Sequence, residues 1–176
     1  MKRALIVVDM QVDFITGALG FDGAQSVKDH VVRHIEAART KGRDVIFTMD
    51  THGEDYETTV EGRHLPVKHC IKGTKGHALH PEIAAIKRGG DTVIEKPTFP
   101  ASGLLEHLQN IGYTDVTLVG LVSHICVISN AIITKAALPN AAIRVDARAT
   151  GGPDASMHEQ SLNIMENLHI DIINRS

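Results

Sequence analysis

The sequence predicts an α/β protein, a three-layer α/β/α sandwich around a mostly parallel sheet of about six strands. Short apolar, β-branched segments alternate along the chain with segments whose apolar residues recur at helical spacing. Such alternation is typical of parallel strands joined by crossover helices that cover both faces of the sheet. With 176 residues, 43% hydrophobic and 22% charged, a single domain spanning residues 1–176 is expected.

The first half of the chain contains three predicted strands, each leading to a charged residue: 5–8 before Asp9, 44–49 before Asp50, and 91–95 before Lys96. Between the first two, a helix is expected with Ser26 as its N-cap and an end near Gly42. A short helix should follow Pro81. Residues 51–80 lack any sustained period, and a polar loop of this length inside a compact domain is usually functional.

The second half continues the alternation with six predicted elements: a helix through 104–111, a strand at 115–119, a helix through 125–136, a strand at 143–145, a helix at 156–168 and a strand at 170–173. The helical spacing predicts that the following residues face inward: Ile125, Ile128, Ile132 and Ala136 in one helix, and Leu162, Met165 and Leu168 in another.

Composition narrows the class of function. The formal net charge is −3 without a basic block, and aromatic residues are only 3% of the chain, so nucleic acid is not an expected partner. No apolar run approaches membrane-spanning length, so no membrane partner is expected either. Two cysteines without an export signal fit a reducing compartment, and we expect a cytoplasmic protein.

Asp9, Asp50, Lys96 and Cys126 each follow a predicted strand. Because carboxyl ends of parallel strands meet at one edge of a sheet, these side chains should converge there. Cys126 lies in the first turn of a helix, where unpaired N–H groups and the helix dipole should lower its pKa and could hold an oxyanion. Asp9 could exchange a proton with the thiol, and Lys96 could favour the thiolate. The alternative is a buried structural cysteine.

Asp50 and His52 form a second candidate constellation. In extended backbone, residues two apart point the same way, so this carboxylate and imidazole could bind one metal ion. The long loop offers further donors: Glu61, His64, His69, His77 and His80.

Several stretches together resemble one known family. They are Val8-Asp9-Met10-Gln11-Val12-Asp13-Phe14, Asp50-Thr51-His52, His69-Cys70-Ile71-Lys72-Gly73-Thr74, Glu95-Lys96 and Gly120-Leu121-Val122-Ser123-His124-Ile125-Cys126-Val127. Across essentially its whole length, the chain resembles the isochorismatase-like cysteine hydrolases, and among them the nicotinamidase/pyrazinamidase type. The resemblance implies that Asp9, Lys96 and Cys126 form a catalytic triad. It also implies a non-proline cis peptide at Val122–Ser123, which helps aim the Ser123 and Cys126 N–H groups into an oxyanion hole.

The same resemblance implies one divalent metal ion, zinc foremost, with iron or manganese as alternatives. Asp50, His52 and His69 match its ligand positions. Glu61 is the preferred further ligand, with His64 as the alternative. Phe14 and Phe99 would wall the substrate ring, although the aromatic residue that some members carry just before the loop histidine is absent.

The activity implied is hydrolysis of nicotinamide to nicotinate and ammonia through a thioester on Cys126, by a homo-oligomer acting on a small amide. Two alternatives stay open at this point. One is a metal-free relative that hydrolyses another amide or a carbamoyl compound. The other, from a different class, is a receiver-type phosphoacceptor domain, whose acidic residues and lysine Asp9, Asp13, Asp50 and Lys96 could imitate.

Overall fold

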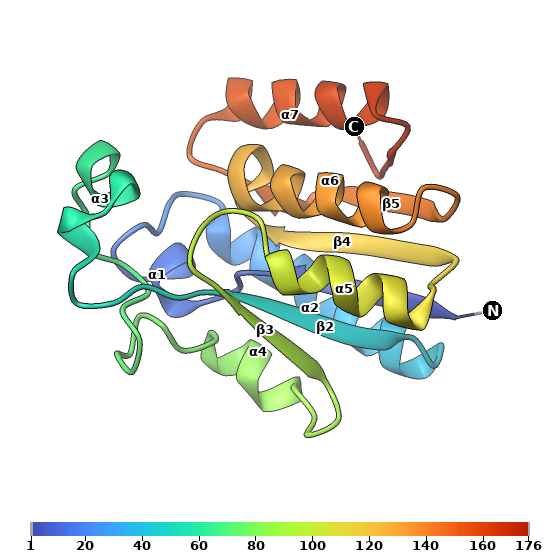
Figure 1. The fold of residues 1–176 in the computed structure, drawn as a ribbon, viewed down its shortest axis with the longest axis horizontal. Helices are drawn as coiled ribbons and strands as arrows, with labels where there is room; N and C mark the ends of the chain where they lie inside the picture. The colour runs from blue at the N-terminus through green and yellow to red at the C-terminus, as the bar shows by residue number, and fades with distance from the viewer. Residues whose placement is uncertain (1, 176) are drawn as a thin grey trace.

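The computed structural model describes residues 2–175 and contains a six-stranded sheet in the order β3-β2-β1-β4-β5-β6, with all neighbouring strands parallel (Figure 1). The strands are β1 (Arg3–Val8), β2 (Asp44–Asp50), β3 (Thr92–Lys96), β4 (Asp115–Leu121), β5 (Ala142–Gly151) and β6 (Asp171–Ile173). The predicted α/β architecture is confirmed.

Helices cover both faces of this sheet (Figure 1). The helical segments are α1 (Val12–Ile15), α2 (Ala24–Thr40), η1 (Tyr56–Thr58), α3 (Val60–His64), α4 (Pro81–Ile86), α5 (Ser102–Ile111), the π-helical turn η2 (Ser123–Val127), α6 (Ile128–Ala137) and α7 (Ala155–Asn167). One buried apolar cluster lies under α5, α6 and α7, and a second lies under α1, α2 and α4. No helix among residues 2–175 combines the length and the hydropathy needed to cross a membrane.

Strand order reverses between β1 and β4, so the crevice beyond these two strands is where ligands of open parallel sheets bind. The strands approach closely at this point. Gly120 of β4 is paired with Val8 of β1 and has φ 121°, and a Cβ atom built on Gly120 would lie 2.1 Å from the Val8 carbonyl oxygen. Only glycine combines this backbone conformation with this approach.

Three details of the helices differ from the prediction. Helix α2 begins at Ala24 after Gly23, so Ser26 is not its N-cap. Ile132 and Ala136, both predicted to face inward, are exposed, because the π-helical turn η2 adds a residue and rotates the α6 residues that follow it. Leu168, also predicted inward, is 39% exposed beyond the end of α7, while Ile170 is buried in its place.

The long connection between β2 and α4 extends beyond the carboxyl ends of the strands and carries η1 and α3 (Figure 1). The later part of this connection, around Cys70, lies next to its start at His52. The N–H of His52 donates to the Cys70 carbonyl, and the N–H of Lys72 donates to the His52 carbonyl. The Asp13 carboxylate accepts the N–H of Cys70 at 2.8 Å and fixes the returning segment to the body of the protein.

Candidate active site

Asp9, Lys96 and Cys126, here called the nucleophile group, meet at the carboxyl ends of β1, β3 and β4. Lys96 Nζ lies 2.7 Å from Asp9 Oδ2 and 3.5 Å from Cys126 Sγ. Burial acts against the charged lysine, but the negative charge of Asp9 foremost, and that of Asp50, raise the pKa of Lys96, so the ammonium persists. The structure therefore brings together the three side chains that the strand ends predicted.

The protonation of Cys126 differs from the prediction made from its place in a helical turn. Burial, followed by the negative charge of Asp9, raises the pKa of the Cys126 thiol well above its usual value, and Lys96 only partly offsets this. Desolvation at this buried position outweighs the effect of the helix start. The resting group is accordingly a thiol that must pass its proton to a neighbour before the sulfur can attack a carbonyl.

Asp9 is the neighbour suited to that transfer. Burial foremost, and then the charge of Asp50, raise the pKa of Asp9, although Lys96 and the Thr48 hydroxyl oppose the rise. The Thr48 hydroxyl donates to Asp9 Oδ1 at 2.6 Å and orients the carboxylate. A carboxylate with a raised pKa is a better proton acceptor, as general base catalysis requires.

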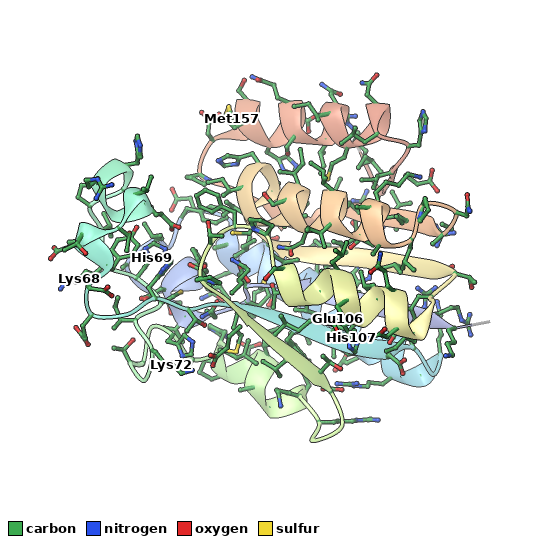
Figure 2. The ribbon with its side chains drawn as sticks, in the orientation of Figure 1. Lys68, His69, Lys72, Glu106, His107 and Met157 are labelled. Atoms are coloured by element: carbon green, nitrogen blue, oxygen red, sulfur yellow. The ribbon has the colours of Figure 1, made fainter. Side chains whose placement is uncertain are left out.

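Asp50, His52, Glu61 and His69, here called the carboxylate–imidazole group, lie next to the nucleophile group. Each offers a donor atom, and these atoms lie within 4.8 Å of one another. His52 Nε2 is 2.8 Å and His69 Nε2 3.3 Å from Asp50 Oδ2, and both nitrogens are 3.6 Å from Glu61 Oε1. His69 lies beside Lys68 on the connection that carries α3 (Figure 2), whereas His64 is exposed and outside the group.

The chemistry of these four donors fits a divalent metal ion. Two imidazole nitrogens and two carboxylates are ligands that zinc, iron and manganese accept. Glu61 Oε2 is buried without a hydrogen-bond partner among residues 2–175, as expected of a ligand atom whose partner is a cation. His69 Nδ1 lies 2.8 Å from the Val67 carbonyl, which fixes the ring and leaves Nε2 facing the group.

Lys96 links the two groups, because its Nζ also donates to Asp50 Oδ1 at 3.0 Å. Burial works against ionisation of Asp50, but hydrogen bonds with His52 and His69 and the charge of Lys96 lower the pKa of Asp50 overall. Burial and then Asp50 raise the pKa of Glu61. The carboxylate–imidazole group therefore concentrates negative charge that a cation would neutralise.

A cavity of about 220 Å³ opens onto both groups and reaches Cys126, Asp50, Glu61 and His69. Its remaining walls are mainly apolar: Phe14, Leu19, Leu65, Phe99, Val122, Ile125 and Pro153, with His124 beside them. Phe14 is buried and packs edge-on against His69, with ring centroids 5.7 Å apart, while Phe99 is 40% exposed. Both predicted aromatic residues thus line the cavity.

The cis peptide bond is one residue earlier than predicted. It joins Leu121 to Val122, and the Val122–Ser123 bond is not cis. Val122 lines the cavity, whereas Ser123 is fully buried and its hydroxyl lies 3.0 Å from His158 Nδ1. The cis bond therefore leads into Val122, the residue that lines the cavity, and not into Ser123 as predicted.

Two buried amides near the site were not predicted to have a role. Gln11 donates to the carbonyls of Asp50 and His77 and accepts the N–H of Asp50, each at 2.8 Å. Asn130 donates to the Cys126 and Phe99 carbonyls and accepts the N–H of Ala101. Asn130 lies outside the apolar stripe predicted for its helix, so the spacing gave no signal for it.

Comparison with known proteins places this geometry in a family. The model of the isochorismatase domain matches residues 3–175. The chain belongs to this family. It is 32% identical over 181 residues to a probable inactive nicotinamidase of Arabidopsis thaliana, covering 96% of this chain and 90% of that one.

Solved structures share the fold over nearly the full chain. A nicotinamidase/pyrazinamidase from Bacillus subtilis has a TM-score of 0.86 at 27% identity, covering 98% of this chain and 99% of that one. A pyrazinamidase of Pyrococcus horikoshii in complex with zinc has a TM-score of 0.85 at 24% identity, covering 99% and 100%. Membership of the isochorismatase family excludes the receiver-type alternative.

Proposed function

We propose that this protein is a cysteine-dependent amidohydrolase of the nicotinamidase type, which converts nicotinamide to nicotinate and ammonia. The observation that carries the proposal is the Lys96 ammonium, which contacts the Cys126 thiol, the Asp9 carboxylate and the Asp50 carboxylate within 3.5 Å. The apolar cavity above Cys126 supports a flat ring as the rest of the substrate.

The chemical steps use the nucleophile group. Asp9 accepts the thiol proton as Cys126 Sγ bonds to the amide carbon, and the N–H groups of Val122 and Cys126 would hold the oxyanion. The carbon–nitrogen bond then breaks, Asp9 returns the proton to the leaving ammonia, and a thioester remains. Asp9 takes a proton from water as that water attacks the thioester, which releases the acid and restores the thiol.

Asp50, His52, Glu61 and His69 would hold one divalent metal ion in this proposal. When bound, such an ion supplies a Lewis acid that orients the substrate ring. Both carboxylates of this set, Asp50 and Glu61, line the same cavity as Phe14 and Phe99.

The test is ammonia release from nicotinamide by the purified protein and by Cys126→Ala. We expect turnover by the unmodified protein and a loss of at least about 10⁴-fold in the variant, since nucleophile and base act as one unit. The variant should remain folded, as judged by circular dichroism. Turnover that survives in Cys126→Ala would refute the mechanism.

A panel of other small amides and carbamoyl compounds separates the alternatives. Hydrolysis of one of these in preference to nicotinamide, unaffected by a chelator, would favour a metal-free hydrolase. A folded protein that hydrolyses nothing would place it with the probable inactive relative instead.

A further inference from the structure

Tyr56, in η1, is the side chain against which the carboxylate–imidazole group packs. It is fully buried, and its ring lies edge-on to both imidazoles, with centroids 4.8 Å from His52 and 5.0 Å from His69. Its hydroxyl is directed away from the four-residue group, to the Leu65 carbonyl. Any influence of Tyr56 on that group must therefore act through the position of its neighbours.

Tyr56 also holds α3 at both ends. At the start of the helix, the Thr59 N-cap donates its hydroxyl to the Tyr56 carbonyl at 2.7 Å and accepts the N–H of Gly62. At its end, the Tyr56 hydroxyl donates to the Leu65 carbonyl at 2.9 Å, and the N–H of Leu65 donates to the Glu61 carbonyl. The side chain and the carbonyl of one residue thus fix the short helix from two directions.

Gly62 allows this approach. A Cβ atom built on Gly62 would lie 2.0 Å from the Tyr56 carbonyl oxygen and 2.9 Å from the Glu57 Cα, both of them backbone atoms. Since backbone cannot move aside as a flexible side chain does, any larger residue would push α3 away from Tyr56. Glu61 is the adjacent residue and would move with it.

A helix as short as α3 is not stable by itself, so its place comes from its contacts. Glu61 is the one donor of the carboxylate–imidazole group that this helix carries. Its Oε1 lies 3.6 Å from both imidazole nitrogens, and a shift of α3 would change both distances together.

We propose that Tyr56 and Gly62 are positioning residues that bring Glu61 to the metal-binding group. The inference rests on the proposed metal centre. It adds that the fourth donor depends on a glycine and an aromatic residue outside the ligand set, neither of which binds the ion.

The first test measures zinc affinity of the metal-stripped protein by competition with a chromophoric chelator. Gly62→Ala should bind zinc about 10- to 100-fold more weakly, the range typical for residues that orient ligands. Gly103→Ala is the matched control, because its Cβ would approach only the end of the Ile94 side chain, at 3.4 Å. Gly103→Ala should bind zinc as the unmodified protein does.

The second test keeps the fold intact by removing only a hydroxyl. Tyr56→Phe retains the ring beside the imidazoles but loses the bond to Leu65, and we expect roughly three- to tenfold weaker zinc binding, as for one neutral hydrogen bond. Tyr113→Phe is the control: Tyr113 is buried too, and its hydroxyl donates to Asp44 at the opposite end of the sheet. Equal affinities of Tyr56→Phe and the unmodified protein would argue against the inference.

A double-mutant comparison separates positioning from general loosening. If Gly62 acts through Glu61, then Gly62→Ala should weaken zinc binding little further in a Glu61→Gln background. Independent, additive losses would overturn the inference while leaving the metal centre intact. If the unmodified protein binds no zinc, cobalt or manganese, the metal centre and the inference fall together, whereas ammonia release would still test the nucleophile group.

Discussion

The nucleophile group and the carboxylate–imidazole group lie side by side but balance their charges differently. Asp9 and Lys96 pair a carboxylate with an ammonium inside the fold, both completely buried. The second group sets two carboxylates against two imidazoles and shares only Lys96 as a cation. The charges of the nucleophile group are balanced by protein side chains alone, whereas those of the carboxylate–imidazole group would be balanced by a bound cation.

The two groups also differ in their supports. Asp9, Lys96 and Cys126 follow strands whose neighbours fix their direction, while His52, Glu61 and His69 lie on the long connection beyond the sheet. The geometry of the nucleophile group should therefore persist without metal, whereas the long connection should gain order and stability when metal binds.

The largest effect is expected from Lys96→Met. The change leaves Asp9 and Asp50 as neighbouring buried carboxylates without their cation, which should reduce the free energy of unfolding by about 3–5 kcal/mol and abolish ammonia release. Lys72→Met, which breaks an exposed pair with Glu95, should change stability by less than about 1 kcal/mol. Urea unfolding measures both, and similar losses in the two variants would contradict the charge balance described here.

Metal addition should give the next largest effect. Zinc at 100 times its dissociation constant should raise the free energy of unfolding of the stripped protein by about 2.7 kcal/mol, provided the unfolded chain does not bind it. Cys126→Ala should keep this increase, and His52→Gln should lose most of it. Thermal unfolding with and without zinc is the measurement. Stabilisation of equal size in His52→Gln would place the ion elsewhere.

The smallest effect concerns a carboxylate outside the site. Burial disfavours the charged form of Asp146, but hydrogen bonds from His34, the Arg148 N–H and Asn174 lower its pKa to about 2. A lowered pKa stabilises the fold above the unfolded value near 4, and this contribution disappears as pH falls through about 2. Asp146→Asn should therefore lose about 1–2 kcal/mol at pH 6 and almost nothing at pH 2.

Ammonia release by Asp146→Asn at neutral pH should match that of the unmodified protein, because Asp146 contacts neither group of the site. Urea unfolding across the pH range tests the other half of the expectation. A stability difference that stays constant with pH would show that the residue acts by packing and not by its charge.

The sequence was sufficient to predict that Asp9, Lys96 and Cys126 lie at one edge of the sheet. The carboxyl ends of parallel strands meet at that edge whatever the details of the helices. The sequence was insufficient for the pKa of Cys126. The helix start is visible in the sequence, but the enclosure of the sulfur depends on distant elements, and that enclosure decides the direction of the shift.

Local irregularity explains other errors. Prediction from hydrophobic periodicity assumes a uniform α-helix. It therefore assigned Ile132 to the interior and did not predict the π-helical turn that precedes this residue. Helix α3 is too short to show a period, so the residues left Glu61 as one of five candidate donors in the long loop, and only the family resemblance made it the preferred ligand. Gln11 and Asn130 act through backbone groups far away in the chain, which no local pattern encodes.

The Gln11 amide joins Asp50, where the long connection leaves the sheet, to His77, where it returns. The intervening segment is therefore tied at its base, and changes in its length should not displace Asp50. Doubling a flexible loop costs only about 0.6 kcal/mol in closure entropy. Insertions around Leu65, which lines the cavity, should accordingly change the cavity wall without displacing Asp50.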